Sequence, residues 1–269
     1  MTEDAERVAA IADAFVSHWS HFGRYPGASL HDEDGVLWYE SPIAHLPYNA
    51  VIRARIAGDV DAVVARVVER FRARDVPFMW VVKPGDEPAD LGARLAAQGL
   101  DLAEKATGMD LDLGGWSPEP LPPGVTIERG DDPDRLRDYE TLIRTYWAVP
   151  DEARDLIETM NRHWSGERSP GLRFVAYADG EPLGKLFLNL AGLPVAAVYG
   201  VAVVPAARGR GVATALMTQA LREARERGAT RAVLHSSPMA LGMYRRMGFT
   251  ERCPLDAWAT GPLFGTHHH

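Results

Sequence analysis

The chain of 269 residues contains a single cysteine, Cys253, so it can form neither an intramolecular disulfide nor a cysteine-based metal cluster. It also lacks an apolar run of about 18 residues, the length that a membrane-spanning helix requires. Its first residues are acidic and have no long apolar core, unlike a secretory leader. We therefore expect a cytoplasmic protein with no membrane partner and no bound metal.

A surplus of positive charge is absent as well. The formal net charge is −8 and the sequence pI is about 5.6, which argues against a nucleic-acid-binding surface. An acidic protein suits simple solubility, and its field also attracts cationic small molecules such as amines. Hydrophobic residues make up 46% and charged residues 25%, as in an ordinary globular protein long enough for two domains.

One segment divides the sequence into two parts. Residues 114–124 contain four prolines and three glycines, and such a composition sustains neither a helix nor a central strand. The division predicts an N-terminal α/β domain over residues 1–113, a linker over 114–124 and a second domain over 125–266. Trp116 in the linker is expected to pack on one of the domains. The last three histidines, 267–269, resemble the remnant of an affinity tag and are left out of metal reasoning.

Hydrophobic periodicity and turn residues predict alternating strands and helices in both parts. Before the linker, Asp59 is the expected N-cap of a helix that extends to Arg74. The other elements expected there are a helix over Asp4–His21, strands over Val36–Glu40, Asn49–Ile56, Pro77–Val82 and Gly108–Leu113, and a helix over Ala89–Gln98.

After the linker, Asp179-Gly180 is a strong turn signal between two strands, Leu172–Tyr177 and Pro182–Leu190. The other elements expected there are strands over Val125–Arg129, Val195–Val204, Arg231–His235 and Phe249–Trp258, and helices over Asp134–Trp147, Gly211–Arg227 and Met239–Met247. The predicted fold class is therefore α/β (α+β), with a mixed central sheet flanked by helices.

The two parts share an order of elements: strand, long helix, strand, short helix ending at glycine, strand. Residues 94–100, which end in Gly99-Leu100, correspond to residues 243–249, which end in Gly248-Phe249. This order suggests an internal duplication, although strand–helix alternation also recurs by chance in α/β proteins.

The segment between Pro205 and the long helix has the features of a diphosphate site. Gly209 and Gly211 allow tight backbone geometry, and the amides there and in the first helical turn can converge on an anion. Arg208 and Arg210 add full positive charges. A P-loop is excluded because no Gly-Lys-Ser/Thr follows, and a dinucleotide fingerprint fails because Thr214 stands at its third glycine.

Two motifs together resemble the GNAT superfamily of acetyl-CoA-dependent N-acetyltransferases. Residues 201–213, Val-Ala-Val-Val-Pro-Ala-Ala-Arg-Gly-Arg-Gly-Val-Ala, are similar to its Arg/Gln-x-x-Gly-x-Gly/Ala signature after a strand and a proline. Residues 237–249 resemble its second signature, which typically reads Asn-x-x-Ala-x-x-Leu-Tyr-x-x-x-Gly-Phe. The resemblance covers about residues 125–258 and implies a GNAT fold there. If the first part shares this fold, we expect a degenerate copy without a CoA site, because residues 56–61 lack paired glycines and arginine, and Asp59 and Asp61 would repel a diphosphate.

The resemblance also implies roles for individual residues. The backbone of Val201, Ala202 and Val203 would pair with the pantetheine arm of acetyl-CoA, as an added strand would. The pyrophosphate would be held by the loop that comprises Arg208, Gly209, Arg210, Gly211, Val212 and Ala213. Ser237 stands where the family often has a CoA-contacting asparagine, and Tyr244 would be the general acid.

The general base that such a reaction requires is missing from this pattern. A lysine-like amine has a pKa of about 10.4, so deprotonating it at neutral pH costs roughly 4–5 kcal/mol. Neither cofactor-side strand contains a carboxylate. His235 has a suitable intrinsic pKa, and it can equally be a structural residue. A water chain or an acceptor of low pKa would also serve, whereas nothing near Cys253 in sequence would activate its thiol.

The sequence thus predicts N-acetyl transfer to an amine, by direct attack in a ternary complex with acetyl-CoA as cosubstrate. Two alternatives remain open: a CoA-binding sensor or interaction protein without turnover, and an acyltransferase that uses a longer acyl donor. A small molecule is the expected acceptor, and neither its identity nor the oligomeric state follows from the sequence.

Overall fold

A computed structural model describes residues 2–261 and shows a mixed α/β fold. These residues form two compact units, and each has its own core. The first unit contains residues 2–108, 236–239 and 252–261, and the second contains residues 109–235 and 240–251. The suspected tag remnant lies outside the described residues. No helix within residues 2–261 is both long and apolar enough to cross a bilayer.

The first unit combines three α-helices with a mixed sheet of antiparallel and parallel strands. Its strands are ordered β1-β2-β3-β4-β11-β5, and β3 and β4 run parallel with α2 between them in sequence. In chain order its elements are α1 (Glu3–Ser20), β1 (Ser29–Glu33), β2 (Val36–Glu40), β3 (Ala50–Ala54), α2 (Val60–Ala73), β4 (Met79–Val82), α3 (Leu91–Ala97), β5 (Asp101–Asp112) and β11 (Thr250–Ala259).

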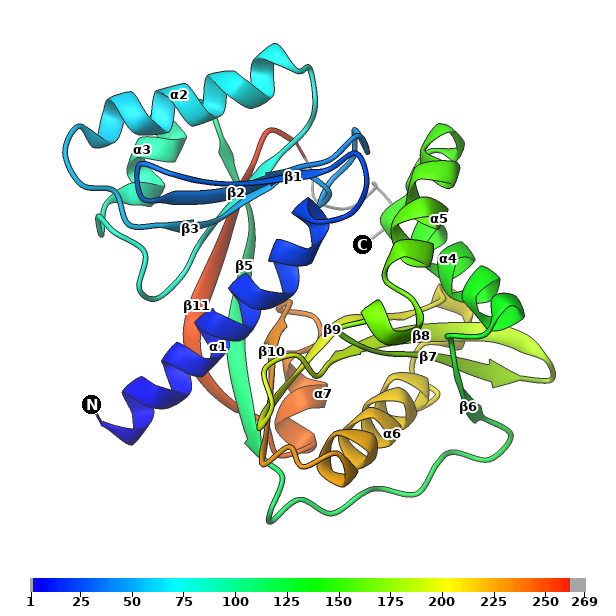
Figure 1. The fold of residues 1–269 in the computed structure, drawn as a ribbon. Coiled ribbons are helices and arrows are strands. Elements are labelled where there is room, and N and C mark those ends of the chain that lie inside the picture. The colour runs from blue at the N-terminus through cyan, green and yellow to red at the C-terminus, as the bar shows by residue number, and fades with distance from the viewer. Residues whose placement is uncertain (1, 262–269) are drawn as a thin grey trace. The chain divides into compact units, whose positions relative to one another are not determined.

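The predicted cap and apolar face of α2 explain why this helix forms where it does. Asp59 Oδ1 accepts a hydrogen bond from the Ala62 amide at 3.1 Å, as the capping prediction requires. Val64, Val67 and Phe71 recur at helical spacing and are fully buried against the sheet. Helix α1 covers the opposite face of β1–β3 (Figure 1).

The second unit places helices on both faces of its part of the sheet. Its strands are ordered β5-β10-β9-β8-β7-β6, and β9 and β10 run parallel with α6 between them in sequence. In chain order its elements are β6 (Thr126–Arg129), α4 (Pro133–Trp147), α5 (Arg154–His163), β7 (Gly171–Ala178), β8 (Glu181–Asn189), β9 (Val195–Val203), α6 (Val212–Glu226), β10 (Arg231–Ser236) and α7 (Leu241–Arg246).

Helix α6 lies on one face of β7–β9, and α4 and α5 lie on the other (Figure 1). Leu216, Ala220 and Leu221 of α6 are fully buried in a core that also includes Leu186 and Leu188 of β8. The predicted hairpin around Asp179-Gly180 is confirmed, because β7 and β8 pair antiparallel across that turn. The sheet thus separates an apolar α6 layer from a more polar α4 layer.

The linker packs on the second unit, as expected for Trp116. Its indole is buried in the second core, its carbonyl accepts a hydrogen bond from Arg225 of α6 at 3.0 Å, and the guanidinium of Arg225 lies 5.6 Å from the ring centroid. No strand or helix lies between β5 and β6. Three features were missed by the sequence analysis: strand β1, helix α5 and the first half of β5.

Candidate functional site

The glycine-rich loop after β9 is anchored at both ends and exposed between them. Ala207 and Val212 are each 1% exposed and belong to the second core. Between them Gly209 and Gly211 have φ angles of +73° and +78°, a left-handed conformation that other residues rarely adopt. A Cβ at Gly209 would touch nothing, so glycine serves the backbone conformation there and not the packing. The loop therefore presents its backbone outward from a fixed base.

Helix α6 begins directly after this loop without a side-chain cap. Its N-cap residue is Gly211, and no side chain of the described residues accepts from the amides of the first turn. Arg208 and Arg210 are exposed, and neither forms an ion pair or side-chain hydrogen bond within residues 2–261. Free amides, the positive end of a helix dipole and guanidinium groups are the groups with which proteins bind anions, and all three gather at this loop. The sequence-predicted pyrophosphate residues are thus brought together on one loop.

The two parallel strands that flank α6 separate near this loop. Their pairing runs from Val195 with Arg231 to Val198 with Leu234 and goes no further among the described residues. Strand β9 nevertheless continues to Val203, held on its other side by β8 through Gly184 and Lys185. The β10-facing edge of Val201–Val203 is therefore open, as pairing with an extended ligand requires. We call this opening the fork.

A backbone irregularity marks the inner end of the fork. Gly200 has φ +58°, and the register between β8 and β9 shifts between Lys185 and Phe187. The side chain of Lys185 is buried at this irregularity, and its Nζ donates to the Gly200 carbonyl at 2.8 Å. The sequence analysis did not single out Lys185, because a lysine on a hairpin strand is ordinarily expected to face solvent.

Tyr244 lies in α7 and belongs to the second core. It is 5% exposed, and its ring lies edge-on to that of Phe249 at 5.8 Å between centroids. Burial, with a smaller contribution from Tyr146, raises the pKa of Tyr244 well above its ordinary value. The hydroxyl is therefore protonated at neutral pH, and it has no hydrogen-bond partner within residues 2–261.

His235 lies one residue past the last β9–β10 pair, at the inner end of the fork. Its ring packs against Tyr199 of β9 at 5.4 Å between centroids. Burial lowers the pKa of His235 to about 4, so the imidazole is neutral at pH 7 but only weakly basic. The structure thus places both Tyr244 and His235 in the second unit.

Two other residues from the sequence analysis are less informative. Ser237 follows β10, is partly buried, and accepts a hydrogen bond at its carbonyl from Ser236 Oγ at 2.8 Å. Cys253 is buried in the first unit, and burial, with a smaller contribution from Asp4, raises the pKa of its thiol to about 11. The thiol is thus inert as a nucleophile at neutral pH.

These features define a class of protein: an α/β fold with a cationic glycine-rich loop beside an opened parallel strand pair. Residues 136–249 match the model of the acetyltransferase (GNAT) family. The match includes the glycine loop, the fork and Tyr244. This part of the chain therefore belongs to the GNAT superfamily, as its two motifs predict.

Solved structures extend the likeness in fold to nearly the whole chain. A GCN5-related N-acetyltransferase from Kribbella flavida has a TM-score of 0.71 at 17% identity, with coverage of 94% of this chain and 96% of that chain. A tandem GNAT protein from the clavulanic acid biosynthesis pathway has a TM-score of 0.61 at 15% identity, with 97% of each chain covered. The overall fold is thus that of a tandem GNAT protein. None of the curated protein sequences compared with this chain matches it.

Proposed function

We propose that this protein is an acetyl-CoA-dependent N-acetyltransferase that moves an acetyl group to an amine by direct attack in a ternary complex. The supporting observation is the fork, whose open β9 edge leads into the uncapped N-terminus of α6. The loop of Arg208–Ala213 would hold the pyrophosphate, and the backbone of Val201–Val203 would pair with the pantetheine arm. Residues 125–266 would form the catalytic domain, and residues 1–113 a GNAT-like domain without a CoA site.

Acetyl-CoA supplies an activated thioester when bound. Tyr244 is then the proposed general acid, because its hydroxyl is protonated and has no competing hydrogen bond within residues 2–261. Its pKa exceeds that of a thiol, about 8.5, so the tyrosinate formed on donation must be reprotonated at once. The proton that the acceptor nitrogen loses on forming the amide can serve this purpose.

The α4–α5 side of the sheet is the proposed place for the amine acceptor. Aromatic residues gather there in edge-on pairs, Tyr146 with Trp147 and His163 with Trp164, at 5.3 and 4.6 Å between centroids. The net charge of −8 also favours a cationic acceptor over an anionic one. A small-molecule amine fits these observations.

Thiol release from acetyl-CoA tests this proposal, with a diamine, an aminosugar, an amino acid and a short peptide as acceptors. We expect at least one amine to stimulate release, and Tyr244→Phe to lower the rate about 100-fold with little change in CoA affinity. Tyr177→Phe is the matched control, because Tyr177 lies on β7 and its hydroxyl donates a hydrogen bond to Asp138 of α4. A wild-type protein that binds acetyl-CoA but releases no thiol with any amine contradicts the proposal.

One observation favours a second candidate, a CoA-binding sensor without turnover. Neither β9 nor β10 contains a carboxylate that could act as a base. For a sensor, CoA binding would be retained in Tyr244→Phe and thiol release would be absent in the wild type. A donor with a longer acyl chain would appear as faster release from that thioester than from acetyl-CoA.

A further inference from the structure

The reaction proposed above needs a group that takes a proton from the acceptor amine. Strands β9 and β10 contain no carboxylate, and His235, with a pKa near 4, is a weak base. A general base acts best when its pKa lies close to the working pH. The reaction therefore requires another basic group at the fork.

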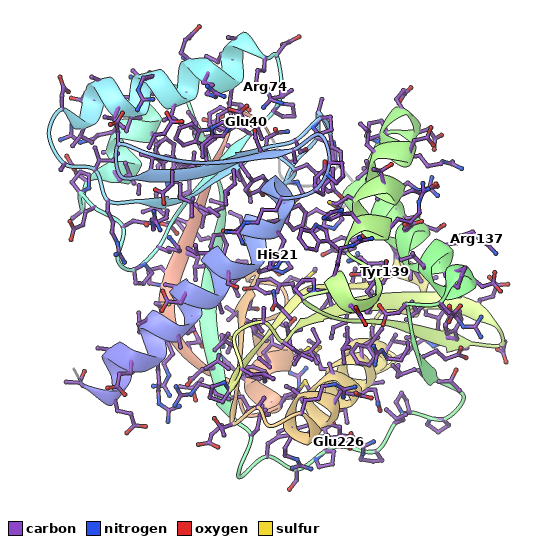
Figure 2. All side chains as sticks on the ribbon, viewed as in Figure 1. His21, Glu40, Arg74, Arg137, Tyr139 and Glu226 are labelled. Atoms are coloured by element: carbon purple, nitrogen blue, oxygen red, sulfur yellow. The ribbon has the colours of Figure 1, made fainter. Side chains whose placement is uncertain are left out.

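Lys185 lies at the fork and is almost completely buried. Its side chain belongs to β8, is 3% exposed, and reaches across to β9, where Nζ donates to the Gly200 carbonyl at 2.8 Å. The same nitrogen lies 5.2 Å from the ring centroid of Tyr139 on α4, which Figure 2 labels on the α4 side of the sheet. A Cβ at position 200 would come within 2.9 Å of Nζ, so the glycine also makes room for the amine.

The position of this amine follows from the direction of the proposed ligand. The phosphate loop lies beyond the C-terminal end of β9, so a pantetheine arm that starts there runs back along Val203 toward Val201. Its thioester end then comes to Gly200 and the inner end of the fork, where pairing between β9 and β10 begins. The Lys185 amine contacts the strand at this end and not at the phosphate end.

The surroundings of Lys185 leave its amine uncharged for much of the physiological range. Burial alone lowers its pKa to about 7, and no carboxylate within residues 2–261 forms an ion pair with it. Titratable groups on the elements packed around it include Tyr139 and Glu140 of α4, Arg173 of β7 and Tyr199 of β9. Burial raises the pKa of both tyrosines, which are neutral at pH 7. With one N–H on Gly200 and another toward the Tyr139 ring, the neutral amine keeps a lone pair to accept a proton.

The choice of residue at this position is itself informative. Lys83, Lys105 and Lys185 are the only lysines among 29 lysine and arginine residues. Arginine could also donate to the Gly200 carbonyl, but its guanidinium stays protonated in proteins, whereas a buried lysine releases its proton readily. Among the lysine and arginine side chains of this protein, few can therefore lose a proton, and one of those few lies at the fork.

We infer that Lys185 is the general base of the acetyl transfer, acting on the amine acceptor at the inner end of the fork. This assignment rests on the function proposed above. The acceptor ammonium gives one proton to Lys185 Nζ, and its freed nitrogen forms the C–N bond with the thioester carbonyl carbon. The C–S bond then breaks with its electron pair on sulfur. Tyr244 protonates that sulfur and regains a proton from the new amide nitrogen, and Lys185 releases its proton to solvent.

The pH dependence of amine-stimulated thiol release tests the assignment in three proteins. We expect the wild-type rate to rise to a plateau with a midpoint near pH 7. Lys185→Met should lower the rate at pH 7 about 100-fold. Its rate should keep rising toward the pKa of the acceptor itself, so that the deficit shrinks at pH 9.5, and the KM for acetyl-CoA should not change.

Lys185→Gln distinguishes a general base from a residue that only stabilises the backbone irregularity at Gly200. Glutamine retains an N–H donor for the Gly200 carbonyl but cannot accept a proton at neutral pH. It should share the low rate and altered pH profile of Lys185→Met. A Lys185→Gln protein with the wild-type rate and midpoint overturns the inference and leaves the proposed function intact. A wild-type protein that neither binds CoA nor transfers acetyl groups overturns the proposed function first.

A measurement on the wild-type protein does not depend on whether these variants fold. With only three lysines, protein labelled with ¹³C at lysine Cε gives three NMR signals, assignable by replacing each lysine in turn. We expect the Lys185 signal to shift with a midpoint near pH 7, with the exposed Lys105 as the reference. A Lys185 signal that stays in its protonated position from pH 5 to about 9 overturns the inference.

Discussion

Both units contain a strand–helix–strand arrangement with parallel strands. They differ in whether the positive N-terminus of the helix and a buried lysine are paired with a carboxylate. In the first unit, Asp59 caps α2, and Lys83 forms a buried ion pair with Asp86 at 2.9 Å. In the second unit, α6 begins at Gly211 without a side-chain cap, and Lys185 has no carboxylate partner within residues 2–261. In the first unit, carboxylates of the fold pair with both the helix N-terminus and the lysine. In the second unit, both remain available to a ligand.

This contrast separates a structural use of the fold from a functional one. The Asp86 carboxylate accepts from the amides of Ala54 and Lys83 as well as from Lys83 Nζ, so that pair is satisfied within the fold. A capped helix has no free amide to offer a phosphate at that position, and a carboxylate there repels one. The same supersecondary structure can therefore lose or keep an anion site through a single cap residue.

The largest effect should come from the buried lysine of the second unit. Its pKa is about 7 in the folded protein and about 10.5 in the unfolded chain, so between these pH values the unfolded state binds more protons and stability rises with pH. Between pH 7 and 9.5 the wild type should gain roughly 3 kcal/mol over Lys185→Met in urea unfolding. Lys105→Met, at an exposed site, is the control, and a wild-type to Lys185→Met difference that stays constant with pH contradicts this account.

A capping carboxylate at the start of α6, like Asp59 at the start of α2, should remove the proposed phosphate site of the second unit. Gly211→Asp places a carboxylate where Asp59 stands in α2, and its repulsion of a diphosphate should weaken CoA binding about 100-fold or more in calorimetry. Gly228→Asp is the matched control, because Gly228 follows the same helix and also has a positive φ, +89°, with open space around it. Near-wild-type CoA affinity for Gly211→Asp would show that the loop is not the phosphate site.

Much of this contrast was predictable from sequence. The Asp59 cap, the Asp179-Gly180 hairpin and the glycine loop depend on neighbouring residues, so their signals are local. Strand β1 was missed because His31, Asp32 and Glu33 show no apolar alternation on a partly exposed strand. Lys185 could not be found, because its burial depends on the packing of α4 and on the irregularity in β9, and neither is encoded near residue 185.

Removing the two arginine charges of the second unit's glycine-rich loop should weaken CoA binding without abolishing it. Arg208→Ala combined with Arg210→Ala is expected to weaken CoA binding about tenfold, because each exposed guanidinium contributes up to about 1 kcal/mol. The effect should fade at high salt. Arg66→Ala in α2, an exposed arginine of the first unit, should leave the affinity unchanged. An equal loss in all these variants would indicate a general charge effect instead of a loop site.

The smallest effect should be confined to the first unit. Asp59→Ala removes the α2 cap and should lower the free energy of unfolding by about 1 kcal/mol, with CoA affinity unaffected. Glu69→Ala, an exposed position of the same helix, should change stability by less than about 0.5 kcal/mol. A gain or loss of CoA affinity in Asp59→Ala would mean that α2 also contributes to binding.

The stoichiometry of CoA binding, measured by titration calorimetry of the purified protein, tests the central claim most directly. The account predicts one CoA per chain, held by the open α6 loop and not by the capped α2. Two equivalents per chain, or no detectable heat at millimolar CoA, would contradict it.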